Sequence, residues 1–172
     1  MSTSFIISLL CSAIIVFVFL RMAFSYTQKR AHQRYADNKQ KAPSINSFRH
    51  LSKALFVLSM LVTVVSYWLD FPRYLQFHDS LILQLAGALW VLFGYVGLHF
   101  SFQRLADNYS PLFDAYKPFS LVNTGVYATI RHPIYAFNLC VSFGLALSSG
   151  IILVMLMALT GFAFVLRAVF IE

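Results

Sequence analysis

Long apolar stretches recur along the chain with polar segments between them, a pattern that predicts helices crossing a membrane. A bilayer core about 30 Å thick needs roughly 20 apolar residues for each helical crossing. Five stretches approach or reach that length, and we predict them as transmembrane helices: 5–24, 54–69, 81–102, 134–147 and 151–170. The expected fold is therefore all-α and polytopic, with residues 1–172 forming a single membrane domain.

The fourth and fifth stretches are separated only by Ser148, Ser149 and Gly150, which predicts a tight C-terminal helical hairpin. The fourth stretch is shorter than a usual membrane crossing. Its helix either begins within the preceding polar segment or forms a re-entrant half-helix, and we favour the first interpretation.

Composition agrees with a membrane location, because 59% of the residues are hydrophobic and only 11% are charged. A soluble fold of this length could not bury so much apolar surface. The first stretch lacks a basic segment before it and a small-residue cleavage site after it, so we predict a retained helix. Cys11 and Cys140 lie inside apolar stretches, and neither a disulfide nor a metal site is predicted.

The positive charge is concentrated in one part of the chain. Eight of the thirteen Lys and Arg residues lie within 21–53, and the formal net charge is +7. The positive-inside rule places that loop in the cytoplasm, which puts the amino terminus outside and both the segment 103–131 and the carboxyl terminus inside. No nucleic-acid partner is needed to explain the charge. The loop either binds anionic membrane lipid or only sets the topology, and we favour the second interpretation.

The cytoplasmic segment 104–135 is polar and rich in aromatic residues, and it contains the best candidate site. Gly125 predicts a turn in which the backbone can approach a ligand closely. Arg131 and His132 precede Pro133, which suits the first turn of the fourth helix. The N–H groups at such a helix start attract a carboxylate or a phosphate.

The run LVNTGVYATIRHPIY at 121–135 resembles the L-V-x-x-G-x-Y-x-x-x-R-H-P-x-Y signature of the isoprenylcysteine carboxyl methyltransferase family. Upstream, LADNYS at 105–110 is similar to the family's L-G-x-N-[WY]-S stretch, with Ala106 in place of glycine. The resemblance covers roughly 85–172 and includes the helical hairpin. It is far more specific than a short glycine motif.

The resemblance implies S-adenosylmethionine as the methyl donor and a lipidic or prenylated acceptor, such as an isoprenylcysteine carboxylate. Arg167 corresponds to a family arginine that contacts the substrate carboxylate. A family glutamate four residues later contacts the cofactor, but Ile171 stands there and Glu172 follows, a helical rotation of about 100°. The family usually continues beyond this point, so we expect the chain to be a fragment. By the same resemblance, the cofactor pocket contains Leu121, Val122, Tyr127, His132, Pro133, Ile134 and Tyr135.

Methyl transfer from a sulfonium to a carboxylate needs neither a metal nor a general base, because the carboxylate is already ionised at neutral pH. The protein then only has to align the reactants and exclude water. His132 would serve as a general base if the acceptor were an amine or a hydroxyl. For His99 and Asn138 we prefer interhelical hydrogen bonds over ligand contacts.

Three alternatives remain open. A phospholipid amine methyltransferase and an NADPH-dependent sterol-type reductase both resemble this topology, although no arginine cluster for a pyrophosphate is recognisable. The third alternative is a membrane scaffold or transport subunit, but the apolar stretches contain almost no ionisable residues near their centres.

Overall fold

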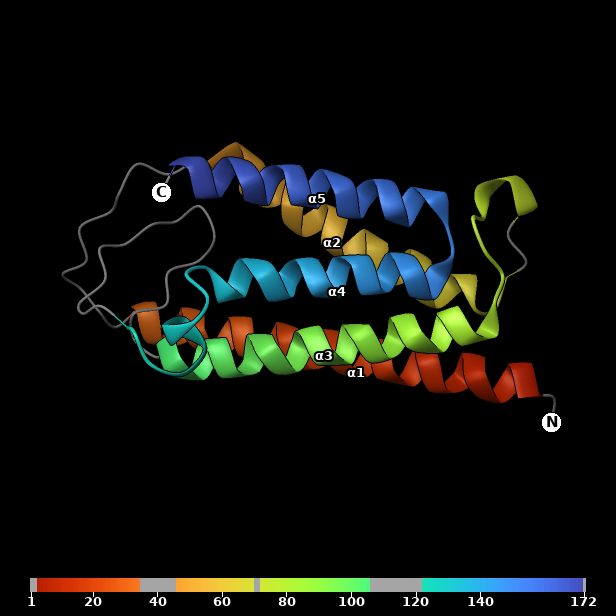
Figure 1. The fold of residues 1–172 in the computed structure, drawn as a ribbon, viewed down its shortest axis with the longest axis horizontal. Helices are drawn as coiled ribbons and strands as arrows, with labels where there is room; N and C mark the ends of the chain where they lie inside the picture. Colours follow the sequence, from red (N-terminus) through yellow and green to blue (C-terminus); the bar gives the residue numbers. More distant parts are fainter. Residues whose placement is uncertain (1–2, 35–45, 70–71, 106–121, 172) are drawn as a thin grey trace.

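Five α-helices and two short 3₁₀ turns make up the described part of the computed structural model, which covers residues 3–34, 46–69, 72–105 and 122–171 (Figure 1). The all-α prediction is confirmed. The helices are α1 (Thr3–Arg34), α2 (Asn46–Ser66), α3 (Leu81–Leu105), α4 (Pro133–Ser149) and α5 (Ile152–Ile171), and the turns are η1 (Arg73–Leu75) and η3 (Gly125–Ala128).

Helix α4 lies at the centre of the bundle. It packs against α2, α3 and α5, while α1 lies along α3 (Figure 1). The end of α3, the turn η3, the start of α4 and the end of α5 all meet at one end of the bundle, which we call the η3 end. At the opposite end, which we call the hairpin end, α4 turns into α5.

The first, second and fourth helices differ most from their predicted boundaries. The first helix spans Thr3–Arg34 rather than 5–24. The second helix begins at Asn46 rather than at 54 and ends at Ser66 rather than at 69. The fourth helix spans Pro133–Ser149, 17 residues, or about 25 Å at 1.5 Å per residue. It does not extend back into the polar segment as we expected, because Pro133 occupies its first turn and η3 precedes it. It runs alongside α3 (Figure 1), and the choice between a full crossing and a re-entrant half-helix stays a prediction.

Small residues let α3 and α4 approach each other closely. A Cβ added at Gly94 of α3 would lie 2.8 Å from Val141 Cγ2 and 2.9 Å from the Val141 backbone nitrogen of α4. At one end of this contact, Gly87 of α3 lies against Gly144 and Ser148 of α4. The buried core surrounds this contact and draws on all five helices, with Ile15, Val18, Met60, Val91, Leu98, Val141, Leu145, Val154 and Ala158 among its members.

At the hairpin end, the connection between α2 and α3 is hydrogen-bonded to the turn between α4 and α5. Gly150 ends α4 in the left-handed conformation, with φ of +66°, and its N–H donates to the Ala146 carbonyl at 3.0 Å. The Phe77 N–H donates to the Gly150 carbonyl at 2.8 Å, and His78 Nε2 donates to the Leu147 carbonyl at 2.6 Å. The two connections therefore hold each other in place.

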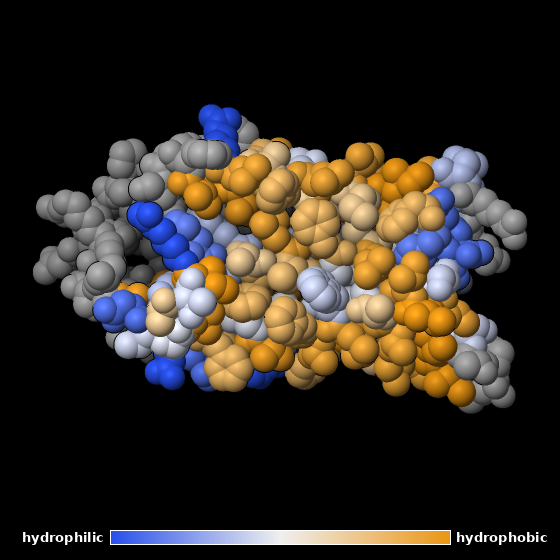
Figure 2. Space-filling view, in the orientation of Figure 1, coloured by the Kyte–Doolittle hydropathy of each residue, from blue (hydrophilic) through white to orange (hydrophobic). Residues whose placement is uncertain are grey.

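The exposed surface supports a membrane location. Helices α1 and α3 are long and apolar enough to cross a bilayer. Yet only 28% of the most apolar stretch of α1 and 33% of that of α3 are buried. The core helix of a soluble protein would be mostly buried. Figure 2 shows an apolar surface over the middle of the bundle and hydrophilic residues near its ends. The apolar parts of the other three helices, Ala54–Ser66, Pro133–Ser149 and Ile152–Arg167, are shorter.

The close contact between α3 and α4 can be tested with a pair of glycine substitutions. Gly94→Ala should lower the free energy of unfolding of the detergent-solubilised protein by about 1–3 kcal/mol, because the added methyl group overlaps Val141. The unfolding temperature should fall accordingly. Gly161→Ala of α5 is the matched control. A Cβ there meets nothing within 4 Å, so the better helix propensity of alanine should leave stability unchanged or slightly raised. Equal unfolding temperatures for the two variants would contradict this packing.

Candidate methyl-transfer site

The turn η3 is fixed to the end of α3 through a glycine. Gly125 has a φ of +63°, a conformation that favours glycine. A Cβ at this position would lie 2.9 Å from Nε and 3.3 Å from Cδ of Arg104, so the arginine side chain lies directly over the glycine. The turn closes with the Ile130 N–H donating to the Val126 carbonyl at 3.0 Å. We expected the open side of Gly125 to face a ligand, but Arg104 covers it, and sequence reasoning gave Arg104 no role in the site.

Helix α4 begins without a side-chain cap. His132 is the N-cap residue, with φ of −125° and ψ of 63°, and its side chain makes no capping hydrogen bond. Its imidazole stacks on the Tyr135 ring instead, with centroids 5.4 Å apart and planes 10° apart. Pro133 follows as the first helical residue, as predicted, and is buried. Because the His132 side chain does not cap the helix, the N–H groups of the first turn can bind other acceptors. An anionic ligand group is a suitable acceptor.

Tyr127 carries an unsatisfied polar atom at this end of the bundle. Its hydroxyl oxygen is buried and has no hydrogen-bond partner among the described residues. Burial raises the pKa of Tyr127 to about 12, so the phenol stays neutral and keeps its proton to donate. A buried hydroxyl without a partner is unfavourable by about 1–3 kcal/mol. Binding of a polar ligand group would remove that penalty, which makes Tyr127 the strongest structural indication of a ligand site.

Arg167 lies at the same end of the bundle as His132 and Tyr135. Helices α4 and α5 are antiparallel, and the rings of Phe143 and Phe162 meet at 6.4 Å. Continuing this register toward the end of α5 puts the exposed Arg167 level with the first turns of α4. The last described core residue of α5 is Ala158, so α5 packs less closely toward the η3 end.

The structure describes only some of the remaining predicted pocket residues. Val122 is half-buried just before η3, and Ile134 is half-buried and packs against the core. Leu121 and Glu172 lie outside the described residues, so the out-of-phase glutamate stays a prediction. His99 pairs with Gln103 of its own helix at 3.0 Å, so the prediction of an interhelical bond for His99 is wrong.

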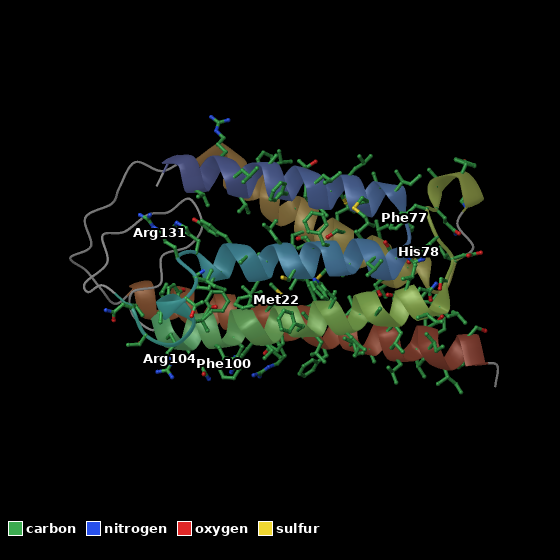
Figure 3. All side chains as sticks on the ribbon, viewed as in Figure 1. Met22, Phe77, His78, Phe100, Arg104 and Arg131 are labelled. Atoms are coloured by element: carbon green, nitrogen blue, oxygen red, sulfur yellow. The ribbon has the colours of Figure 1, made fainter. Side chains whose placement is uncertain are left out.

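The described side chains around the η3 end carry positive charge. Arg104 and Arg131 both lie at this end, one from α3 and one just before α4 (Figure 3), and both are exposed. Together with Arg167 they create a potential that attracts anionic groups. A soluble anionic ligand and a phosphate-bearing lipid would both be drawn to such a site.

Comparison with known proteins identifies the kind of protein to which this site belongs. The family model for phospholipid methyltransferase matches residues 82–172, more than half of the chain. The match includes α3, η3, α4 and α5, and so the whole candidate site. No curated protein is significantly similar to the chain.

The chain is thus a membrane methyltransferase, and its family implies S-adenosylmethionine as the methyl donor. It belongs to the phospholipid methyltransferase family, part of a superfamily that also includes the isoprenylcysteine carboxyl methyltransferases. The predicted activity class and cofactor agree with this result. The family name supports the phospholipid alternative better than the isoprenylcysteine acceptor.

The buried Tyr127 hydroxyl allows a test that separates a ligand contact from a structural role. Tyr127→Phe should leave the unfolding temperature of the ligand-free protein unchanged or raised, because it removes an unsatisfied polar atom. The same change should weaken binding of S-adenosylhomocysteine by about fivefold or more, measured by calorimetry.

Tyr74→Phe is the matched control, since Tyr74 is 78% exposed in η1. It should alter neither property. If Tyr127→Phe destabilised the ligand-free protein and left binding intact, the hydroxyl would have a structural role instead.

Proposed function

We propose that this protein transfers a methyl group from S-adenosylmethionine to the amine of a phospholipid headgroup. The observation that carries the proposal is the phospholipid methyltransferase match over 82–172, which contains every described residue of the candidate site. The apolar outer surface of the bundle also suits a substrate that stays in the bilayer (Figure 2).

The site residues suit both halves of such a reaction. Tyr127 and the uncapped start of α4 would hold the polar groups of the cofactor, which supplies an electrophilic methyl group when bound. Arg167, level with the first two turns of α4, would pair with the headgroup phosphate through its planar guanidinium. Because the phosphate is close to the amine in such a headgroup, this pairing would bring the nitrogen toward Tyr127 and His132.

An amine acceptor adds a chemical requirement that a carboxylate does not have. An ammonium has no lone pair, so its proton must leave before the nitrogen can attack. His132 stands at the start of α4, where its imidazole stacks on Tyr135, and it is the described residue best suited to accept that proton. The stacked tyrosine would keep the ring in one orientation.

A second candidate acceptor is the isoprenylcysteine carboxylate. The resemblance of LVNTGVYATIRHPIY at 121–135 to that family's signature favours it. In this reaction Arg167 would orient the carboxylate and His132 would accept no proton. The two candidates therefore differ in the role of His132 and in their dependence on pH.

Methylation assays with radiolabelled S-adenosylmethionine should distinguish the acceptors. Vesicles containing phosphatidylethanolamine should become labelled, and the rate should rise between about pH 6 and pH 8 as more of the amine loses its proton. A farnesylcysteine analogue should remain unlabelled. Labelling of the analogue alone, at a rate independent of pH in this range, would favour the carboxylate acceptor, because a carboxylate is fully ionised above about pH 6.

Substitution of Arg167 tests its proposed contact with the acceptor. Arg167→Ala should reduce methyl transfer at least tenfold, since a charge-assisted contact contributes about 1.5–3 kcal/mol. Affinity for S-adenosylhomocysteine should stay within a few-fold, and Arg167→Lys should restore part of the activity.

Val169→Ala, another exposed position on α5, is the matched control and should retain activity. Equal losses of cofactor affinity and methyl transfer in Arg167→Ala would contradict a role confined to the acceptor.

A further inference from the structure

A strip of polar side chains follows the outer surface where α1 packs on α3. Arg21 of α1 is exposed, and its Nε donates a hydrogen bond to the Tyr95 hydroxyl of α3 at 3.2 Å. Its guanidinium carbon also lies 5.9 Å from the centre of the Phe24 ring. Tyr95 is only 8% exposed and contacts Phe17 of α1 edge-on. The charged end of Arg21 is therefore held at the boundary between the two helices.

Two further polar residues continue this strip along α3 toward the η3 end. His99 and Gln103 follow Tyr95 at four-residue intervals, so all three lie on one side of the helix. The rings of Tyr95 and His99 are 6.2 Å apart, and the Gln103 amide donates to His99 Nε2 at 3.0 Å. We call Arg21, Tyr95, His99 and Gln103 the α1–α3 seam. From Tyr95 to Gln103 it extends about 12 Å along the axis.

The seam carries positive charge in an apolar setting and has no acidic residue on its own helices. Arg21 lies within the apolar candidate span Ser4–Ser25, and neither α1 nor α3 contains Asp or Glu. An arginine in a bilayer is stabilised by an anion or by reaching the interface. The bond to Tyr95 uses one of the five guanidinium N–H donors. An anion from outside the protein is the natural partner for the others.

The surroundings of the seam indicate an anion attached to apolar chains. Phe17, Phe24 and Phe100 are each about half exposed beside it, and Figure 3 labels Phe100 close to Arg104 at the end of α3. The aromatic side chains suit the acyl chains of a lipid molecule, and the cation beside them suits its phosphate.

We propose that the α1–α3 seam binds an anionic phospholipid, with Arg21 paired to its phosphate and with His99 and Gln103 beside its polar headgroup. The seam residues belong to α1 and α3, whereas Tyr127 and Arg167 of the methyl-transfer site belong to η3 and α5. Arg21 lies outside the matched residues 82–172, so the family relationship does not assign it a function. The bound lipid is a resident partner and not the methyl acceptor.

Native mass spectrometry of the purified chain in detergent tests this proposal by counting bound lipids. Phosphatidylglycerol should be retained in preference to phosphatidylcholine. Arg21→Ala should lower phosphatidylglycerol binding about fivefold, the change expected from one cation facing a headgroup. Tyr95→Phe should lower it about two- to threefold, because the guanidinium loses its anchor on α3.

Two variants serve as matched controls. Lys29→Ala removes the same charge from the same helix and should reduce binding less than twofold. Val169→Ala, an uncharged exposed position on α5, should leave phosphatidylglycerol binding unchanged. Should Arg21→Ala fail to fold, as judged by its thermal unfolding, Arg21→Lys and Tyr95→Phe decide the outcome, with an intermediate loss of binding expected for both.

Several results would overturn the proposal. These are wild-type binding in the folded variants of Arg21 and Tyr95, an equal loss in Lys29→Ala, or equal retention of phosphatidylcholine. Displacement of the lipid by sodium phosphate at about 10 mM would also overturn it, since the seam would then bind a soluble anion and not a membrane lipid.

Discussion

The close packing of α3 against α4 is the constraint on which the rest of the bundle depends. Three glycines let the two backbones approach each other: Gly87, Gly94 and Gly144. No larger residue fits at Gly94 without displacing Val141. Lipid is as apolar as a leucine side chain, so helices in a membrane associate through such close contacts more than through burial of apolar area. The contact holds α3 and α4 side by side, and the turn η3 just before α4 lies against the end of α3.

Much of the fold could be predicted from hydropathy, because the apolar stretches are long and clearly separated. The hairpin was evident from Ser148, Ser149 and Gly150, and Gly150 does adopt the left-handed conformation that ends α4. The helix starts were harder to predict. Helix α2 begins at Asn46 within a polar sequence, where hydropathy carries no signal. For α4, the first-turn preference of Pro133 was a better guide than the length of the apolar stretch.

The sequence proposed residues for the candidate site but could not show their contacts. The motif around Arg131 and His132 lies within the residues that the family model matches. No sequence pattern indicated that Arg104 would cover Gly125, because that contact joins residues from different segments of the chain. Nor could the sequence show that the Tyr127 hydroxyl is buried without a partner among the described residues. Both features arise from packing, and both bear directly on how a ligand would be held.

The hydrogen-bonded hairpin end has a mechanical consequence for the opposite end. His78 and Phe77 tie the α2–α3 connection to the α4–α5 turn, so this turn is a fixed pivot. Helix α5 extends from this turn toward the η3 end. Beyond Ala158 it contributes no further described residue to the buried core. Arg167 lies about 25 Å from the pivot, and a rotation of only about 5° would carry it about 2 Å. A small tilt of one helix would thus suffice to bring a charged side chain to a lipid headgroup or withdraw it, while the core around α4 stays in place.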